Sequence, residues 1–480
     1  MKSHMILLTS SLLLFNLLTA TEDHSEYFEG EGPFESVHEV TEMCLDCHDD
    51  AAFSFMQNVH WTWGSDPTTI PSKSGEHVLG KKTVLNNFCI GLKGNEARCT
   101  SCHAGYGWKD DSFDFSDPMN IDCLVCHDHT GTYKKFPTAA GYPAMERKEF
   151  PPKSGKYFEA VELEAVASSV GGTPTRMACG SCHFYGGGGN NVKHGDLEKA
   201  LVNPSEELDV HMGGEDFTCV DCHESTDHSI SGNALSVSSH RGTLSCTNCH
   251  DEDPHDKYAV FYDQHAKTIA CQTCHIPEFA RENPTKMEWD WSQAGESRPH
   301  EEDQYGMPTY HKKKGAFVWG KNVVPQYAWY NGASEHMVVG DKINLDSSNK
   351  ITAPVGSIED NSALIYPFKI HRGKQIADKK NLYLLPTHLF GGGYWKHFDW
   401  DKSVSVGAAN YGLDYSGKYT FVETEMWWKI NHMVAPKEKA LGCKDCHSKI
   451  EETRFDWKAL GYKEGDPRYN RGTSRFPRVK

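Results

Sequence analysis

Eight copies of the pentapeptide Cys-x-x-Cys-His constrain this chain more than any other feature of its sequence. Sixteen of the 17 cysteines belong to these motifs, and Cys89 is the exception. Two thiols separated by two residues lie on one side of a helical turn, where both can form thioethers to the vinyl groups of one haem. The histidine that follows can then ligate the haem iron. The motifs predict attachment of eight c-type haems through Cys44, Cys47, Cys99, Cys102, Cys123, Cys126, Cys179, Cys182, Cys219, Cys222, Cys246, Cys249, Cys271, Cys274, Cys443 and Cys446. The predicted iron ligands within the motifs are His48, His103, His127, His183, His223, His250, His275 and His447.

Two other uses of paired cysteines fit the pattern poorly. Zinc sites also use Cys-x-x-Cys, but their histidines follow wider spacings, and a histidine directly after every second cysteine has no role there. A disulfide framework is typical of short secreted chains that lack a core. We therefore favour haem attachment over both.

The amino terminus indicates where the protein is located, and the net charge limits the kinds of partner it can bind. Lys2 precedes an apolar run that ends at Leu18 and is followed by a small-residue cleavage site, so residues 1–20 read as a signal peptide. No other stretch is apolar enough to span a membrane, which predicts a periplasmic protein without a stable membrane span. The formal charge of −17 argues against nucleic acid as a partner. We expect a redox partner protein or a quinol-linked electron donor.

The spacing of the motifs divides the mature chain. Residues 21–280 hold seven motifs and form a haem-rich body, whereas residues 281–480 are rich in tryptophan and close with the eighth motif and a basic tail. We expect both parts to pack as one domain. The predicted fold is mainly α with extensive irregular loops and a few short strands, a multihaem cytochrome c fold organised around a stack of eight covalent haems. Helices are expected at residues 156–170 and 421–434, and short strands within residues 336–370.

Each haem iron needs a second axial ligand, and nineteen histidines lie outside the motifs. Several of them are separated from the first cysteine of a motif by five or seven intervening residues, which suggests that one unit supplies the second ligand of a neighbouring haem. The preferred candidates are His38, His60, His194, His211, His240, His265 and His432. The reserves are His129, His228, His255, His388 and His397. If every iron has two histidines, the chain can only relay electrons, so catalysis requires one haem that differs.

Several segments outside the bare motifs resemble the octahaem tetrathionate reductases. They are residues 86–89 (Asn-Asn-Phe-Cys), Cys123 to His127 with residues 130–133, Cys179 to His183 running into a glycine-rich stretch, residues 192–196 (Val-Lys-His-Gly-Asp), and His432 leading to Cys443. The resemblance extends over most of the mature chain. It implies a soluble periplasmic enzyme with seven bis-histidine haems and one active-site haem that a lysine ligates.

On this resemblance the active-site haem is the second along the chain, its lysine is Lys193, and Asn86 and Cys89 line the substrate pocket. Asn190 stands where the family has an acidic residue, which bears on proton delivery and on substrate preference. Whether Lys193 replaces His103 or lies opposite it is left open, and Lys134 and Lys135 are the next candidate lysines. Lys312, Lys313 and Lys314 could steer anions toward the site.

The expected function is reduction of a small anionic or nitrogen-oxide substrate. Electrons would pass through bis-histidine haems to the lysine-ligated haem, where tetrathionate, nitrite or hydroxylamine is reduced. Two alternatives remain at this point: a hydroxylamine-oxidising multihaem enzyme, and a non-catalytic electron-transfer conduit.

Overall fold

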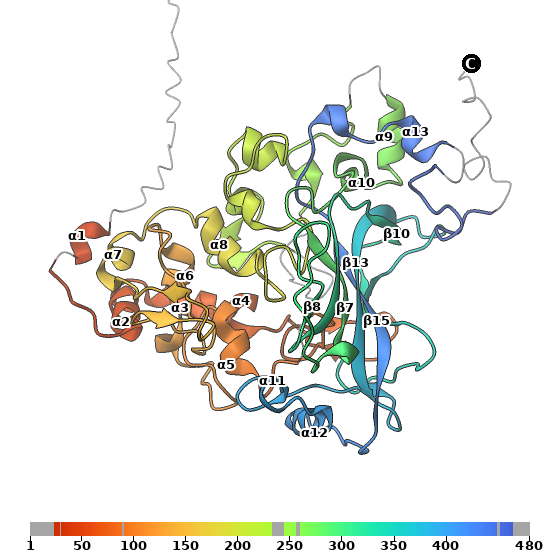
Figure 1. The fold of residues 1–480 in the computed structure, drawn as a ribbon. Helices are drawn as coiled ribbons and strands as arrows, with labels where there is room; N and C mark the ends of the chain where they lie inside the picture. Colours follow the sequence, from red (N-terminus) through yellow and green to blue (C-terminus); the bar gives the residue numbers. More distant parts are fainter. Residues whose placement is uncertain are drawn as a thin grey trace, which may run out of the picture.

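A computed structural model describes residues 24–28, 30–88, 91–232, 244–255, 260–448 and 452–463. The predicted signal peptide and basic tail lie outside these residues. Figure 1 shows two regions side by side: short helices and loops of the first half of the chain, and a twisted sheet from the second half. Among the described residues, no helix is long and apolar enough to cross a bilayer.

The sheet contains nine strands and is the largest regular element of the molecule. Its strands run in the order β11-β12-β15-β13-β7-β9-β8, with β10 and β14 also paired to β13. The central strand, β13 (Leu364–Asp378), pairs antiparallel with β15 (Tyr419–Lys429) along eleven residues. These strands are much longer than the few short strands expected. The expected strands within residues 336–370 are present as β12 (Asn349–Pro354) and the first half of β13.

The helix predicted at residues 421–434 is wrong, because this segment forms β15. Its buried residues alternate, with Val422, Thr424, Met426 and Trp428 on one face of the strand. A period of two is that of a strand, and the segment is rich in the aromatic and β-branched residues that strands favour. Because the segment is rich in apolar residues, its composition fits a helix as well as a strand. The alternation of buried residues distinguishes the two.

The tryptophan-rich segment builds much of the core. Trp289, Trp291, Trp400 and Trp428 are all buried in one large apolar cluster. Trp289 and Trp291 stack with their ring centres 4.7 Å apart. Trp428 also lines the cavity described below, as do Val84, Phe88 and Met426 of the same cluster.

The haem-rich body consists of short helices joined by loops, and every motif lies on a helical turn as predicted. The helix predicted at residues 156–170 is shorter, α7 (Leu163–Ser168), because residues 157–158 join a small hairpin instead. The motif helices are α2 (Val37–Cys47), α5 (Glu96–Cys99) with η1 (Thr100–Cys102), α6 (Leu124–His127), α8 (Arg176–His183), η5 (Cys219–Asp221), η6 (Cys246–Asn248), α10 (Cys271–His275) and α13 (Cys443–Cys446).

The remaining helices and strands belong to one or other of these two regions, and β7, β8, β9, β10, β11 and β14 among them are strands of the sheet. The other helices are α1 (Ser25–Phe28), α3 (Asp49–Phe55), α4 (Val59–Thr62), α9 (Val260–Ala266), α11 (Tyr394–His397) and α12 (Trp400–Asn410). The other strands are β1 (Thr68–Thr69), β2 (Glu76–His77), β3 (Lys148–Glu149), β4 (Tyr157–Phe158), β5 (Ser225–Thr226), β6 (Ser229–Ile230), β7 (Thr285–Asp290), β8 (Tyr310–His311), β9 (Gly315–Gly320), β10 (Gln326–Tyr330), β11 (Ser334–His336) and β14 (Tyr383–Leu384).

Candidate active site and haem ligands

One continuous cavity of about 3480 Å³ runs through the haem-rich body and along the sheet. Fifteen of the sixteen motif cysteines and all eight motif histidines line it. The motifs are therefore not scattered over the surface but open into one shared interior space.

Seven of the eight motif histidines face a second imidazole across this cavity. In each pair the ring centres are between 6.0 and 6.4 Å apart. The pairs, with the motif histidine second, are His24 and His48, His228 and His127, His60 and His183, His432 and His223, His211 and His250, His255 and His275, and His265 and His447.

This spacing fits a metal ion held between two imidazoles. A metal to imidazole nitrogen bond is about 2.0 Å, and the ring centre lies roughly 1.1 Å beyond that nitrogen, so two rings on opposite sides of one ion have centres about 6 Å apart. Rings in van der Waals stacking contact would lie closer. The donor set and its spacing therefore fit haem iron with two axial histidines.

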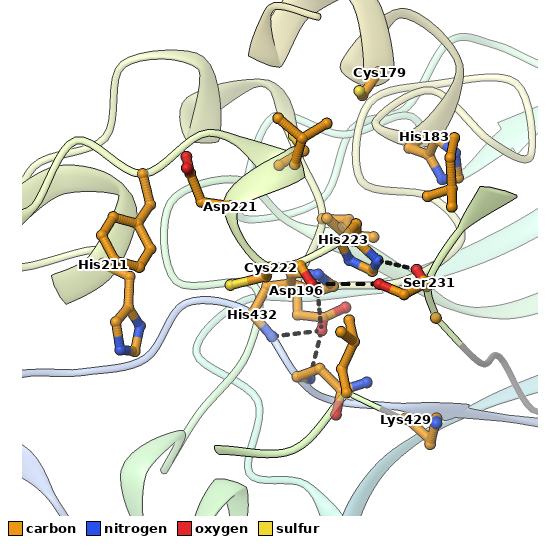
Figure 2. A pocket seen from close by; sticks show the side chains of 18 of the residues that line it. Cys179, His183, Asp196, His211, Asp221, Cys222, His223, Ser231, Lys429 and His432 are labelled. Carbon is orange, nitrogen blue, oxygen red and sulfur yellow. Dashed lines mark hydrogen bonds and ion pairs between the residues drawn. The ribbon is translucent and has the colours of Figure 1, made fainter. Parts of the chain in front are cut away.

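Hydrogen bonds at Nδ1 give several of these imidazoles the form that a ligand needs. The Nδ1 of His432 donates to the Asp196 carboxylate at 3.1 Å, and the Nδ1 of His223 donates to the Ser231 carbonyl at 2.9 Å (Figure 2). His60, His255 and His265 make equivalent Nδ1 contacts with Asn58, Asp263 and the carbonyl of Phe261. Such bonds fix the tautomer and orient the ring so that Nε2 can ligate the metal.

His103, in the second motif, differs from these histidines, because within the described part of the chain it faces no second imidazole and makes no hydrogen bond through Nδ1. Its Nε2 donates a hydrogen bond to the Trp61 carbonyl oxygen at 2.7 Å, and its Nδ1 is buried without a partner. Its backbone is extended, and its backbone N–H donates to the carbonyl of Thr100. In His48 and His223, by contrast, the backbone N–H donates to the carbonyl of the first cysteine of the motif. The ring is fully buried among aromatic side chains. They are Trp61, Trp63, Trp108, Phe113 and Phe115.

Lys193 lies in the cavity wall next to the second motif. Its Nζ is 4.7 Å from the ring centre of Trp428 and 6.0 Å from that of Phe88. Burial, with a smaller contribution from Lys81, lowers the pKa of Lys193 to about 8, and the nearby Cys102 acts in the opposite direction. A lysine ligates a metal only as the neutral amine, so this environment favours the form that could bind iron.

Strand β13 fixes the segment that carries Lys193. The Nζ of the buried Lys369 donates hydrogen bonds to the carbonyl oxygens of Val192 and Lys193 at 2.9 and 3.0 Å, and to the Thr285 hydroxyl. Two positions further along the same face, His371 contacts the side chain of Asn87. Sequence reasoning gave no sign of Lys369, because 176 residues separate it from Lys193.

The other predicted pocket residues have different placements. Asn86 lines the cavity, and its carbonyl accepts a hydrogen bond from Gln375 at 2.8 Å. Cys89 lies outside the described residues. Asn190 does not reach the cavity, because its side-chain oxygen accepts a hydrogen bond from the backbone of Lys199 at 2.8 Å.

Neither Lys134 nor Lys135, the other candidate lysines, lines the cavity as Lys193 does. Lys135 forms a buried ion pair with Asp122 at 2.8 Å and donates hydrogen bonds to the carbonyls of His103 and Gly105. Lys134 is exposed and is not part of the cavity wall. Lys135 thus supports the second motif from behind without facing into the cavity.

The candidate second ligands divide into three groups. Of the preferred set, His60, His211, His265 and His432 face a motif histidine, as do His228 and His255 from the reserves. The other described candidates, for which no facing motif histidine is found, are His38, His129, His194, His388 and His397. His240 lies outside the described residues. His24, which sequence reasoning passed over, is the partner of His48.

Two of the histidines without a motif partner are held in other ways. The Nδ1 of His38 donates to the Met119 carbonyl at 2.9 Å, and its Nε2 accepts from the Tyr142 hydroxyl at 3.0 Å. His194 packs edge to face against Trp428, with ring centres 5.1 Å apart. Burial holds the pKa of His194 well below its usual value, so this ring is a neutral part of the cavity wall.

Contacts between cysteines show which motifs are neighbours. Cysteine side chains lie next to one another between the first motif and the third, the second and the fourth, the fourth and the fifth, and the sixth and the seventh. Electrostatic proximity adds the third to the fourth, the fifth to the sixth and the seventh to the eighth. The motifs therefore form a row in the order 1-3-4-5-6-7-8, with the second motif as a branch beside the fourth.

Comparisons with known proteins agree with this arrangement. Residues 286–450 match the family model described as bacterial cytochrome c, and residues 205–276 match that of cytochrome c7 and related cytochrome c. An uncharacterized protein of Archaeoglobus fulgidus is 24% identical over 254 residues, covering 46% of this chain and 84% of that protein.

A solved structure gives the more extensive match. The crystal structure of the octahaem cytochrome c from Shewanella oneidensis is 47% identical to this chain, with a TM-score of 0.83, and the match covers 94% of this chain and 98% of that one. Identity and coverage at this level include both the haem-rich body and the sheet. The chain belongs to the octahaem cytochromes c.

Proposed function

We propose that this chain is a periplasmic reductase with eight covalent haems, seven of them held by two histidines and one, at the second motif, held by Lys193. The observation that carries the proposal is the asymmetry of the ligands. Seven motif histidines face a second imidazole, whereas His103 is bonded to the Trp61 carbonyl and Lys193 lies beside Cys102. On this arrangement Lys193 takes the place of His103 as the protein ligand.

Haem c held by these residues would supply one-electron redox centres, and the haem held by Lys193 at the second motif would be the one that exchanges electrons with substrate. The chain's own residues set the relation between the centres, because contacts of Cys102 with Cys182 join the second motif to the row at the fourth. A haem with a single neighbouring haem suits the end of an electron path, where electrons are delivered to a substrate. A haem inside the row has neighbours on both sides and would suit a relay.

The charge around the second motif supports an anionic substrate. The chain as a whole carries −17, yet the cation Lys81 lies near Cys102 of the second motif. A local positive potential on an acidic protein raises the concentration of small anions at that place. Tetrathionate, the substrate that the sequence resemblance implies, takes up two electrons as its central sulfur–sulfur bond breaks to give two thiosulfates. Nitrite, and hydroxylamine as a neutral compound, are the other candidates.

Location and partners follow from the same reasoning and remain proposals. The pattern of residues 1–20 supports export, and thioether attachment of haem takes place after export. The electron donor is proposed to be a redox protein or a quinol-linked donor that reaches the row of seven motifs away from the second.

Two measurements on the purified holoprotein test the proposal. The intact mass should exceed that of the mature chain by eight haems. With reduced methyl viologen as donor, we expect oxidation by at least one of tetrathionate, nitrite and hydroxylamine, and a fall of roughly 100-fold in kcat/KM in Lys193→Ala. A protein that transfers no electrons to any of the three is a conduit. A protein that instead releases electrons from hydroxylamine to an oxidised acceptor, and reduces nothing, is the oxidising enzyme.

A further inference from the structure

The turn that follows β2 places Lys81 at the wall of the cavity beside the second motif. Lys81, Lys193, Asn86 and Phe88 all line the same part of this cavity. The Nζ of Lys81 lies 4.2 Å from the ring centre of Trp63, which also lines it. A cation over an indole face is held in place while its remaining N–H groups stay available.

The backbone under Lys81 is tightly fixed. A Cβ atom at Gly80 would lie 2.2 Å from the Trp63 carbonyl oxygen, so the two segments approach as closely as only glycine allows. The turn is closed by hydrogen bonds from the N–H groups of Thr83 and Val84 to the Gly80 carbonyl, at 3.1 and 2.9 Å. The Lys81 side chain therefore extends from a fixed backbone position, which a binding residue requires.

The charge of Lys81 lies close enough to the second motif to act on its groups. Burial is the main cause of the lowered pKa of Lys193, Lys81 lowers it further, and Lys81 also acts on the nearby Cys102. Among the ion pairs of the described residues, none joins Lys81 to a carboxylate. A cation at a cavity wall without an internal counter-ion is suited to a ligand that brings the negative charge.

We propose that Lys81 binds the anionic group of the substrate at the second motif, and that it thereby selects anions over neutral compounds of similar size. This inference rests on the proposed function, because it concerns the same cavity. Lys81 is a binding residue on this view, and Lys193 is not required to contact the substrate charge.

The next residue along the chain provides a matched control. The Nζ of Lys82 lies 3.5 Å from the ring centre of Phe115 and 5.2 Å from that of Trp108, and Lys82 does not line the cavity. Lys81→Gln and Lys82→Gln therefore remove the same charge from adjacent positions of one turn, on different sides.

Substrates of different charge make the test specific. In Lys81→Gln we expect KM to rise about tenfold for the dianion tetrathionate and less for nitrite, with KM for neutral hydroxylamine unchanged and kcat nearly unchanged for all three. In wild type, KM for tetrathionate should rise with ionic strength, and this dependence should weaken in Lys81→Gln. Lys81→Arg should restore a low KM, and Lys82→Gln should resemble wild type.

A binding measurement separates this inference from the proposed function. The oxidised holoprotein is titrated with azide, and the change in its visible and electron paramagnetic resonance spectra gives a Kd without turnover. We expect a several-fold weaker Kd in Lys81→Gln and a wild-type Kd in Lys82→Gln. Equal values for wild type and Lys81→Gln, with both proteins equally stable to heat, overturn the inference even if the enzyme is active. A weaker azide Kd together with no turnover of any substrate supports it and rejects the proposed reductase.

Discussion

The Nζ of Lys369 donates a hydrogen bond of 3.0 Å to the carbonyl oxygen of Lys193, the residue that we assign to the second haem. Lys369 comes from the central strand of the sheet, so the most regular part of the molecule holds the segment that carries Lys193. The sheet is therefore part of the candidate site.

Replacing Lys369 by methionine should disturb the second haem and leave the other seven unchanged. The variant loses three hydrogen bonds from one buried group, a cost of about 2 kcal/mol in the free energy of unfolding. We expect the spectrum of the lysine-ligated iron to shift, as measured by electron paramagnetic resonance. Lys374→Met, on the same strand but in an exposed pair with Glu423 at 3.8 Å, is the control and should change neither property. A normal spectrum in Lys369→Met would show that the lysine segment is held by other contacts.

Asp196→Asn should raise the reduction potential of the haem that we assign to His432 and His223. The carboxylate accepts the Nδ1 hydrogen bond of His432 and increases the electron donation of that imidazole, which favours the oxidised iron. Loss of about 1 kcal/mol of this stabilisation corresponds to roughly 40 mV for one electron. A spectroelectrochemical titration should show one potential moving upward. Eight unmoved potentials would argue against this ligand assignment.

The buried ion pair of Lys135 with Asp122 should be far more important for stability than an exposed pair. The side chains are 3% and 0% exposed, and the hydroxyl of Tyr106 donates a further hydrogen bond to the carboxylate at 2.7 Å. Lys135→Met leaves a buried carboxylate without its counter-ion, which costs about 3 kcal/mol. In the exposed pair of Arg147 with Glu159, Arg147→Met should cost less than about 0.5 kcal/mol. Guanidinium denaturation of both variants measures the difference, and similar losses would contradict the structural role given to Asp122.

His336 gives a pH dependence with a defined sign. Burial lowers its pKa to about 4, whereas the unfolded value is about 6.5. The folded state favours the neutral ring, so its contribution to stability is complete above pH 6.5 and is lost as the pH falls toward 4. His336→Gln should therefore lose about 2 kcal/mol less than wild type between pH 7 and pH 4.5. Urea denaturation at both values tests this, with His129→Gln as the exposed control. The same loss in wild type and His336→Gln would show that the ring is protonated in the folded protein.

The sequence predicted the local features of the haem sites well, because each motif is a single helical turn whose spacing already contains its geometry. It predicted the partners of the motif histidines less completely. His24 and His48 are close in sequence but share no spacing rule with the other pairs, and His60 meets His183 only through the tertiary fold.

The sequence did not predict the large sheet or the residues that surround Lys193. Residues 421–434 are apolar enough for either a helix or a strand, and pairing with β13 selects the strand. Lys369 and Lys81 lie far from Lys193 along the chain and belong to no motif. Their roles depend on which carbonyl or cavity their ammonium groups reach, which is information that only the folded chain contains.

The central claim is that one of the eight irons is ligated by Lys193 in place of a histidine. The most direct test is low-temperature electron paramagnetic resonance combined with near-infrared magnetic circular dichroism of the oxidised wild type, Lys193→Ala and Lys134→Ala. We predict seven bis-histidine haems and one distinct haem in wild type and in Lys134→Ala, and loss of the distinct signal in Lys193→Ala. Eight bis-histidine haems in wild type, or a distinct signal that survives in Lys193→Ala, would contradict the account.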